Sequence, residues 1–243
     1  MNIKELYQKL KKGKEDLIII EGLHAFKHAA RFGADFIDVV TDDKACVKVL
    51  MRKIATDSDV EYVEKYARDI GPADFAHLAS QAERTGLVAF AKKPHYTVGN
   101  FLDGPIVFVE NPHDINNVGA VIRVAAAFGA GAVCMTGEVN PWHVVAVRAA
   151  AGLQWAVPVV QVSSIDDVSA GRTVYACDAD GHNMYKMDVE RNGVFVFGTE
   201  RNGISPELKE RADHTIAIPM QENVSSMNLA TSVSAVLFGC LGK

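Results

Sequence analysis

The segment richest in chemistry is IPMQENVSSMNL, residues 218–229. It follows an apolar run, and the proline at position 219 interrupts regular strand pairing. Ser225 and Ser226 lie where a helix of small residues is expected to begin, because a serine oxygen accepts the free backbone N–H groups of a first helical turn. The segment therefore predicts a tight strand–loop–helix whose backbone amides and carbonyls face a ligand.

A second segment, FGTERNGIS at residues 197–205, superficially resembles a phosphate-binding loop. Ile204 occupies the place of the phosphate-binding lysine, which excludes that function. Gly198 and Gly203 allow the backbone to approach a ligand closely after a buried strand. Taken alone, Glu200 is better explained as a solvated turn residue.

A third segment, residues 110–130, surrounds one arginine with small residues. Positions three and four apart share a helical face; here that face carries Asn116, Gly119, Ala120, Arg123, Ala126 and Ala127. The residues leave two explanations open. Arg123 either pairs with a nearby carboxylate, or its planar guanidinium binds a phosphate beside a ribose.

The three segments together resemble the SpoU (TrmH-type) branch of the SPOUT family of RNA methyltransferases. The matching elements are Asn117-x-Gly119-x-x-x-Arg123, Gly198-x-Glu200-x-x-Gly203, Ile218-Pro219-Met220 and Ser226-Met227-Asn228-Leu229. The chain departs from the family at Met227 and Leu229, which are apolar exchanges, and at Ala230, where many members have serine. Glu222 replaces a frequent glycine of the last loop.

The resemblance implies the fold and the reaction. The fold class is α/β, with a C-terminal parallel-sheet SPOUT domain that contains a deep trefoil knot and forms a homodimer. The implied reaction is transfer of a methyl group from S-adenosylmethionine to a ribose 2′-hydroxyl in structured RNA, with ribosomal RNA slightly favoured over tRNA. The alternatives are a SPOUT methyltransferase that acts on a base, and a non-catalytic RNA-binding protein that retains the fold.

The resemblance also implies the roles of individual residues. The expected catalytic residues are Arg123, Asn117, Glu200, Ser226 and Asn228. The expected cofactor-binding residues are Gly198, Thr199, Glu200, Ile218, Pro219, Met220, Met227 and Asn228. For Arg123 two mechanisms remain open: a general base for the hydroxyl, or a charged clamp on the developing alkoxide and the adjacent phosphate.

The composition limits the possible partners. A net charge of −5 argues against binding nucleic acid through bulk charge. Residues 1–100 are near neutral, with 16 Lys and Arg against 15 Asp and Glu, and begin with a small lysine-rich patch. Four dispersed cysteines fit a reducing cytosol and give no zinc signature. We therefore expect a cytoplasmic protein with no metal, no signal peptide and no membrane span.

Strands and helices alternate along the whole chain, which indicates α/β architecture. We predict an RNA substrate-binding domain at 1–93, a turn-rich linker at 94–104 and a catalytic domain at 105–243. The first domain resembles small ribosomal proteins that bind kinked RNA, through residues 18–28 and 85–94.

The element boundaries are predicted as follows. Strands are expected near 17–20, 36–41, 87–92, 105–110, 132–136, 158–162, 173–177, 194–198 and 214–218. Helices are expected near 2–11, 23–31, 44–55, 72–80, 117–128, 141–151, 205–211 and 225–241. The stretch 57–70 is ambiguous.

Overall fold

The computed structural model describes residues 3–10, 16–78, 86–199 and 202–241, and it divides into two compact units. The first unit comprises Met1–His95 together with Asn140–Ala156, and the second comprises Tyr96–Val139 together with Val157–Lys243. Strands and helices alternate in both, as predicted for an α/β chain. The return of 140–156 to the first unit was not foreseen; the functional domain bounds 1–93 and 105–243 stay a prediction.

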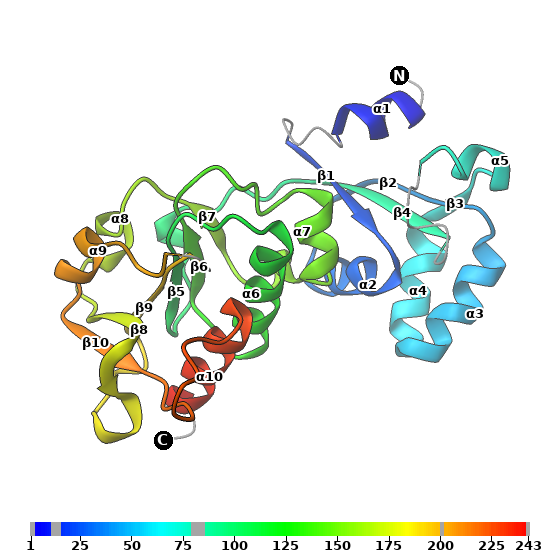
Figure 1. Cartoon of the computed structure of the whole chain (residues 1–243). Coiled ribbons are helices and arrows are strands. Elements are labelled where there is room, and N and C mark those ends of the chain that lie inside the picture. The colour runs from blue at the N-terminus through cyan, green and yellow to red at the C-terminus, as the bar shows by residue number, and fades with distance from the viewer. Residues whose placement is uncertain (1–2, 11–15, 79–85, 200–201, 242–243) are drawn as a thin grey trace. The chain divides into compact units, whose positions relative to one another are not determined.

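The first unit is built on a four-stranded mixed sheet (Figure 1). Its strands, in the order β1-β4-β2-β3, are β1 (Leu17–Glu21), β4 (Leu87–Lys92), β2 (Phe36–Thr41) and β3 (Ala67–Asp69). Strand β4 is antiparallel to both neighbours, whereas β2 and β3 run parallel. Alternate residues of a strand face the same side, so Val88 and Phe90 of β4 share one core with Tyr7 and Val144.

Helices cover this sheet. They are α1 (Ile3–Leu10), α2 (Leu23–Arg31), α3 (Lys44–Ile54), α4 (Asp57–Tyr66), α5 (Pro72–Phe75) and α7 (Val144–Ala149), followed by the short 3₁₀ helix η3 (Leu153–Trp155). The ambiguous stretch 57–70 is thus α4 followed by β3. Helices α3 and α4 lie side by side, and α4 begins with a capping box in which Asp59 accepts hydrogen bonds from Thr56.

The segment 140–156 is firmly packed within the first unit. The backbone of Gly152 has a φ of +73°, and a Cβ there would overlap the backbone of Ala25 in α2. One residue earlier, the carbonyl of Ala151 lies 2.8 Å from Nδ1 of His28. Arg148 of α7 donates to the buried carboxylate of Glu21 at 2.9 Å.

The second unit is built on a six-stranded parallel sheet, in the order β10-β8-β9-β5-β6-β7. The strands are β5 (Ile106–Val109), β6 (Ala132–Met135), β7 (Val159–Gln161), β8 (Val174–Asn183), β9 (Val194–Phe197) and β10 (His214–Ala217). The central strands are continuous apolar runs, as expected of parallel strands that are covered on both faces. The predicted parallel sheet is therefore confirmed.

Helices lie on both faces of this sheet (Figure 1). Helices α8 (Asp166–Ser169) and α9 (Pro206–Glu210) contribute Val168 and Leu208 to a core with β5, β6, β8 and β9. On the other side, α6 (Ile115–Ala127) packs against α10 (Leu229–Leu241). Two 3₁₀ helices, η2 (Val98–Asn100) and η4 (Met184–Lys186), complete the unit.

Several predicted boundaries were wrong. The last helix begins at Leu229 rather than at 225, so Ser225 and Ser226 do not cap it; the Asn228 side chain instead accepts from the N–H of Ala230 at 2.9 Å. The helix predicted from 117 begins at Ile115, because Asp114 caps it.

Other lengths also differ. The helix predicted at 141–151 is helical only at 144–149, and strand β8 extends to Asn183 rather than ending near 177. The helix predicted at 72–80 is α5, which ends at Phe75; residues 79 and 80 lie outside the described chain. Within the described ranges, every helix is too short or too polar to cross a membrane.

Candidate functional site

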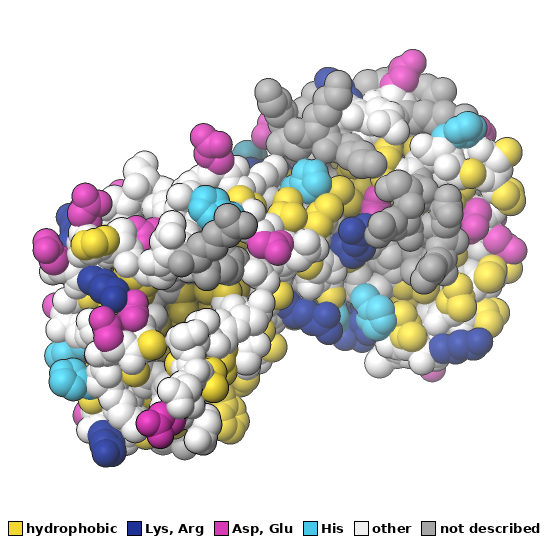
Figure 2. Space-filling model, in the orientation of Figure 1, with side chains coloured by type: hydrophobic (Ala, Val, Ile, Leu, Met, Phe, Trp, Pro, Cys, Tyr) yellow, Lys and Arg dark blue, Asp and Glu magenta, His cyan; other side chains and the backbone are white. Residues whose placement is uncertain are grey.

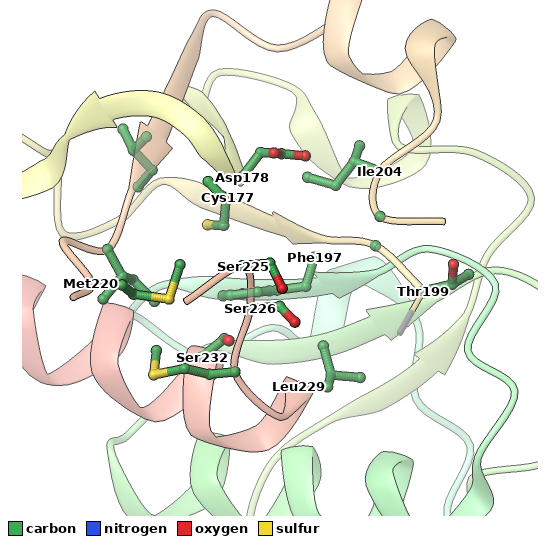
Figure 3. Close-up of a pocket in the computed structure, with 16 residues that line it drawn as sticks. Cys177, Asp178, Phe197, Thr199, Ile204, Met220, Ser225, Ser226, Leu229 and Ser232 are labelled. Carbon is green, nitrogen blue, oxygen red and sulfur yellow. The ribbon is translucent and has the colours of Figure 1, made fainter. Parts of the chain in front are cut away.

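A pocket of ≈ 320 Å³ opens in the second unit, where the neighbouring strands β8, β9 and β10 end or bend (Figure 3). Its lining residues are Cys177, Asp178, Ala179, Phe197, Gly198, Thr199, Gly203, Ile204, Ile216, Ile218, Met220, Ser225, Ser226, Met227, Leu229 and Ser232. In Figure 3, Cys177 and Asp178 line one side, and Leu229 and Ser232 of α10 line the opposite side.

One wall of the pocket is an irregular part of β8. Ala176 pairs with Thr215 of β10, but the next residue of β10, Ile216, pairs with His182. The five residues between Ala176 and His182 on β8 therefore bulge out of the ladder. Three of them, Cys177 to Ala179, line the pocket.

The turn after β9 forms a second wall. Thr199 and Gly203 exchange two backbone hydrogen bonds of 3.0 Å, which fold the turn back on itself. A Cβ on Gly198 would overlap the backbone of Gly203 and Ile204. Gly198 is thus required by the turn itself, and its predicted role in close approach to a ligand stays a prediction. Residues 200 and 201, including the predicted Glu200, lie outside the described chain.

The loop from 218 to 228 forms the third wall. Ile218, Met220 and Met227 give apolar surface, while Ser225 and Ser226 add hydroxyl groups. In this loop Asn223 has a φ of 68°, a left-handed conformation that asparagine tolerates better than most residues. The wall therefore combines apolar side chains with short polar ones, as small-molecule pockets usually do.

A hydrogen bond joins the first and third motifs. The Asn228 side chain donates to Oδ1 of Asn117 at 3.1 Å, across 111 residues of sequence. Asn228 also caps α10, whose first residue, Leu229, lines the pocket. The predicted catalytic residues Asn117 and Asn228 are thus brought together at the start of α6 and α10.

Arg123 lies two turns further along α6 and is exposed. Among the described residues no carboxylate forms an ion pair with it, so the salt-bridge explanation finds no partner there. Arg123 does not line the pocket within this one chain. The remaining small residues of its face are exposed or half-buried, apart from Gly119, which is buried.

The electrostatic centre of the pocket is Asp178. Lys209 of α9 donates to Asp178 at 2.7 Å and lies 3.4 Å from Asp180. Burial alone would raise the pKa of Asp178, but the hydrogen bonds from Lys209 and from the Asp180 backbone lower it. Burial raises the pKa of the Cys177 thiol well above its usual value, so this thiol stays neutral.

The pocket gathers most, but not all, of the predicted binding residues. Those that line it are Gly198, Thr199, Ile218, Met220 and Met227, whereas Pro219 and Asn228 do not; Ser226, predicted as catalytic, also lines it. Sequence reasoning missed Cys177, Asp178 and Ser232. No local signal marks Asp178, because this residue lies within β8 and reaches the pocket through the bulge of that strand.

Trp142 is buried and packs edge-to-face on Trp155 at 5.2 Å, so its ring is not available to stack on a base. No group of His, Cys, Asp and Glu in the described ranges is arranged to hold a metal ion.

Comparison with known proteins gives a family. The model of the SpoU rRNA Methylase family matches residues 104–238. An uncharacterized tRNA/rRNA methyltransferase of Archaeoglobus fulgidus is 28% identical over 181 residues, which are 72% of this chain and 75% of the relative. A 23S rRNA (uridine(2479)-2′-O)-methyltransferase of Streptomyces viridochromogenes is 27% identical over 144 residues, 54% of this chain and 50% of that relative.

Solved structures share the fold over the whole chain. The SpoU methyltransferase AviRb of Streptomyces viridochromogenes, in complex with AdoMet, superposes with a TM-score of 0.82 at 20% identity, covering 100% of this chain and 97% of the other. An AdoMet-bound rRNA methyltransferase of Sinorhizobium meliloti gives a TM-score of 0.78 at 22% identity, with 98% and 92% covered.

Proposed function

The chain belongs to the SpoU rRNA methylase family, and from that premise we propose that it methylates a ribose 2′-hydroxyl of RNA with S-adenosylmethionine as the methyl donor. The observation that carries the proposal is the hydrogen bond between Asn117 and Asn228. This bond connects the helix of Arg123 to the loop and helix that line the pocket. In this proposal the bond thereby fixes Arg123, which acts on the RNA, relative to the loop that binds the cofactor.

The pocket fits S-adenosylmethionine in size and chemistry. Its ≈ 320 Å³ lies at the lower end of the range for small-molecule sites. Ile216, Ile218 and Met220 offer apolar surface suited to an adenine ring, and the hydroxyls of Ser225, Ser226 and Ser232 offer hydrogen bonds. Asp178 places one negative charge beside a ligand that carries positive charge.

The bound cofactor would supply an electrophilic methyl group. The protein's part is to hold the ribose oxygen in line with that group and to remove or shield the hydroxyl proton. We assign the ribose and its phosphate to Arg123, whose guanidinium is unpaired among the described residues and exposed. Arginine keeps its proton at ordinary pH, which favours the charged clamp over the general base.

The other predicted catalytic residues have supporting roles in this proposal. Asn117 and Asn228 fix the corner between the two helices, and Ser226 lines the pocket with its hydroxyl. The role of Glu200 stays a prediction.

We further propose a homodimer through the second unit. The arginine-bearing face of α6 presents small residues that allow another helix to approach closely. Nearby, Phe238 of α10 is 66% exposed and contacts Phe128 edge-on at 6.4 Å. Figure 2 shows hydrophobic side chains exposed over this region. A second copy would bury these rings and surround Arg123.

The first unit is proposed to bind the RNA substrate, with ribosomal RNA slightly favoured over tRNA. Acidic and basic side chains are interspersed on the face drawn in Figure 2, so recognition would rest on shape and on local contacts. The trefoil knot and a cytoplasmic location complete the proposal. An experimental trace of residues 194–241 would test the knot.

One experiment tests the reaction. The purified protein is incubated with ribosomal RNA and with tRNA that lack native modifications, together with labelled S-adenosylmethionine. The RNA is then digested to nucleosides and analysed by mass spectrometry. Label on the ribose supports the proposal. Label on a base would establish the alternative methyltransferase, and binding of RNA without any transfer would support a non-catalytic protein.

A further inference from the structure

Asp178 is the one charged side chain among the described residues that line the pocket. All other lining residues are apolar, small or hydroxylated. The Asp178 side chain is 22% exposed, so bulk water screens it only in part. In a small pocket with reduced screening, one charge influences a ligand wherever the ligand is bound.

The carboxylate is held in place by its neighbours. Lys209 donates at 2.7 Å, and the backbone N–H of Asp180 donates to Oδ1 at 3.4 Å. Oδ2 lies under the turn after β9, 3.7 Å from the position of a Cβ on Gly203. The group of Asp178, Lys209 and Asp180 contains two carboxylates and one ammonium, so its net charge is −1. Lys209 is not part of the pocket lining, which leaves the negative charge on the pocket side.

We propose that Asp178 is a specificity-determining residue that makes the pocket prefer S-adenosylmethionine over the product left after methyl transfer, S-adenosylhomocysteine. This inference rests on the proposed function. The two molecules share the adenine, the ribose and the amino-acid portion, so hydrogen bonds to those parts do not distinguish them. They differ by a methyl group and by the positive charge of the sulfonium.

The direction of the preference follows from desolvation. A pocket of apolar and hydroxyl groups disfavours a cation, because the cation loses its hydration on entry. Such a pocket would retain the neutral thioether product. The Asp178 carboxylate offsets this cost for the sulfonium, whereas its effect on the amino group that both ligands carry cancels in the comparison. The substrate form therefore binds more tightly, and the product form leaves more readily.

Calorimetry with the purified full chain tests the inference. The affinities of both ligands are measured for the wild type and for Asp178→Asn, which keeps the size of the side chain. We expect the preference for S-adenosylmethionine over S-adenosylhomocysteine to fall roughly fivefold or more in Asp178→Asn. Most of this change should come from weaker binding of S-adenosylmethionine, the ligand with the sulfonium charge. The proposal for Asp178 would be overturned if both affinities fell equally, or if the ratio of the two affinities stayed within about twofold of the wild-type ratio.

Two further variants separate charge from structure. Asp166→Asn removes the same charge from a side chain that is 58% exposed and lies outside both the pocket and the group of Asp178, Lys209 and Asp180; the ratio of the two affinities should stay within about twofold. Lys209→Gln removes the opposing ammonium and should raise the preference. A lower preference in Lys209→Gln would contradict the charge explanation, and this variant carries the test if Asp178→Asn does not fold in a thermal scan.

The two proposals fail in different ways. If the wild type binds neither ligand, the cofactor assignment itself is wrong. If the wild type binds both and Asp178→Asn leaves the ratio unchanged, the cofactor assignment survives and only the role of Asp178 is lost.

Discussion

Ion pairs connect separate elements in both units, but among the described pairs one in the second unit also borders the pocket. In the first unit, ion pairs connect separate elements: Arg31 with Asp59 joins α2 to α4, and Arg148 with Glu21 joins α7 to β1. In the second unit, Asp178 and its partner Lys209 lie beside the pocket.

The pocket is otherwise shaped by backbone and by short side chains. Gly198 permits a turn that no larger residue fits, and the wall opposite Asp178 ends in the hydroxyl of Ser232. We therefore expect the stability of the first unit to depend on its ion pairs, and ligand binding by the second unit to depend on the space that its glycines leave. Four experiments test this contrast.

The largest effect on activity is expected at Arg123. Arg123 is an exception to the contrast, because the loss of its charge should lower activity and leave the stability of the protein intact. Arg123→Ala should lower methyl transfer at least about 100-fold while keeping cofactor affinity, since a clamp on developing charge acts only in the transition state. Transfer of labelled methyl to RNA measures this. Arg123→Lys keeps the charge without the planar fork and should remain nearly as poor.

A control accompanies this prediction. Arg191, exposed in the turn before β9, has no assigned role, so Arg191→Ala should transfer methyl groups at the wild-type rate. Recovery of activity by Arg123→Lys with a shifted pH profile would instead favour the general base. Wild-type activity in Arg123→Ala would remove the residue from the mechanism.

Added volume is tested at Gly198. Gly198→Ala places a Cβ on the backbone of Gly203, so the turn must open. We expect the affinity for S-adenosylmethionine to fall at least tenfold, about 1.4 kcal/mol, as measured by calorimetry. Gly171→Ala is the matched control: its φ is +72°, but nothing lies within 4 Å of the new Cβ. That variant should lose some stability and keep its affinity.

Lost charge is tested at Asp59. Burial alone would raise its pKa, but hydrogen bonds from Arg31 and Thr56 lower the pKa from 3.8 to about 2. The resulting stability is present above pH 3.8 and is lost as the pH falls through about 2. Asp59→Asn should thus cost about 2 kcal/mol at neutral pH. Urea unfolding at several pH values should show the difference from wild type shrinking in acid.

The control for Asp59 lies two residues away. Asp57 is exposed in the same first turn of α4, and Asp57→Asn should change stability by only a few tenths of a kcal/mol. If the difference in the free energy of unfolding between wild type and Asp59→Asn stayed constant across the acid range, the ion pair of Asp59 would not account for the stability of the first unit.

The smallest effect is expected at the bond between the two motifs. Asn228→Ala removes both the cap of α10 and the bond to Asn117, and should cost about 1 kcal/mol. Asn117→Ala removes the bond alone and should cost less. A double-mutant cycle from thermal unfolding should give a coupling of about 0.5 kcal/mol or more. Strict additivity would mean that the bond contributes nothing.

The sequence reveals those parts of the fold that depend on local pattern. The parallel strands β5 and β9 follow from continuous apolar runs, and the arginine face of α6 follows from helical spacing. The start of α10 was misplaced because serines at 225 and 226 cap a helix as well as Asn228 does. Asn228 is the cap in the structure, and its side chain also contacts Asn117. Because Asn117 is 111 residues away, the sequence around Asn228 does not indicate this contact.

The candidate site also could be predicted only where local sequence determines the structure. Its glycines and its loop 218–228 were visible as motifs, because short-range backbone geometry requires particular residue types there. Asp178 enters the pocket only through the bulge of β8, which depends on pairing with β10 more than thirty residues later. The register of a strand is decided by its neighbours, so a sequence read one segment at a time misses it.

The placement of residues 140–156 in the first unit has a consequence for folding during synthesis of the chain. A chain made on a ribosome emerges from its N-terminus. The first unit lacks α7 and Arg148, the ion-pair partner of Glu21, until residue 148 has emerged, by which time β5 and β6 of the second unit are already outside. Contacts between such distant residues also slow folding. The first unit can thus complete its fold only after residues 96–139 of the second unit have been translated.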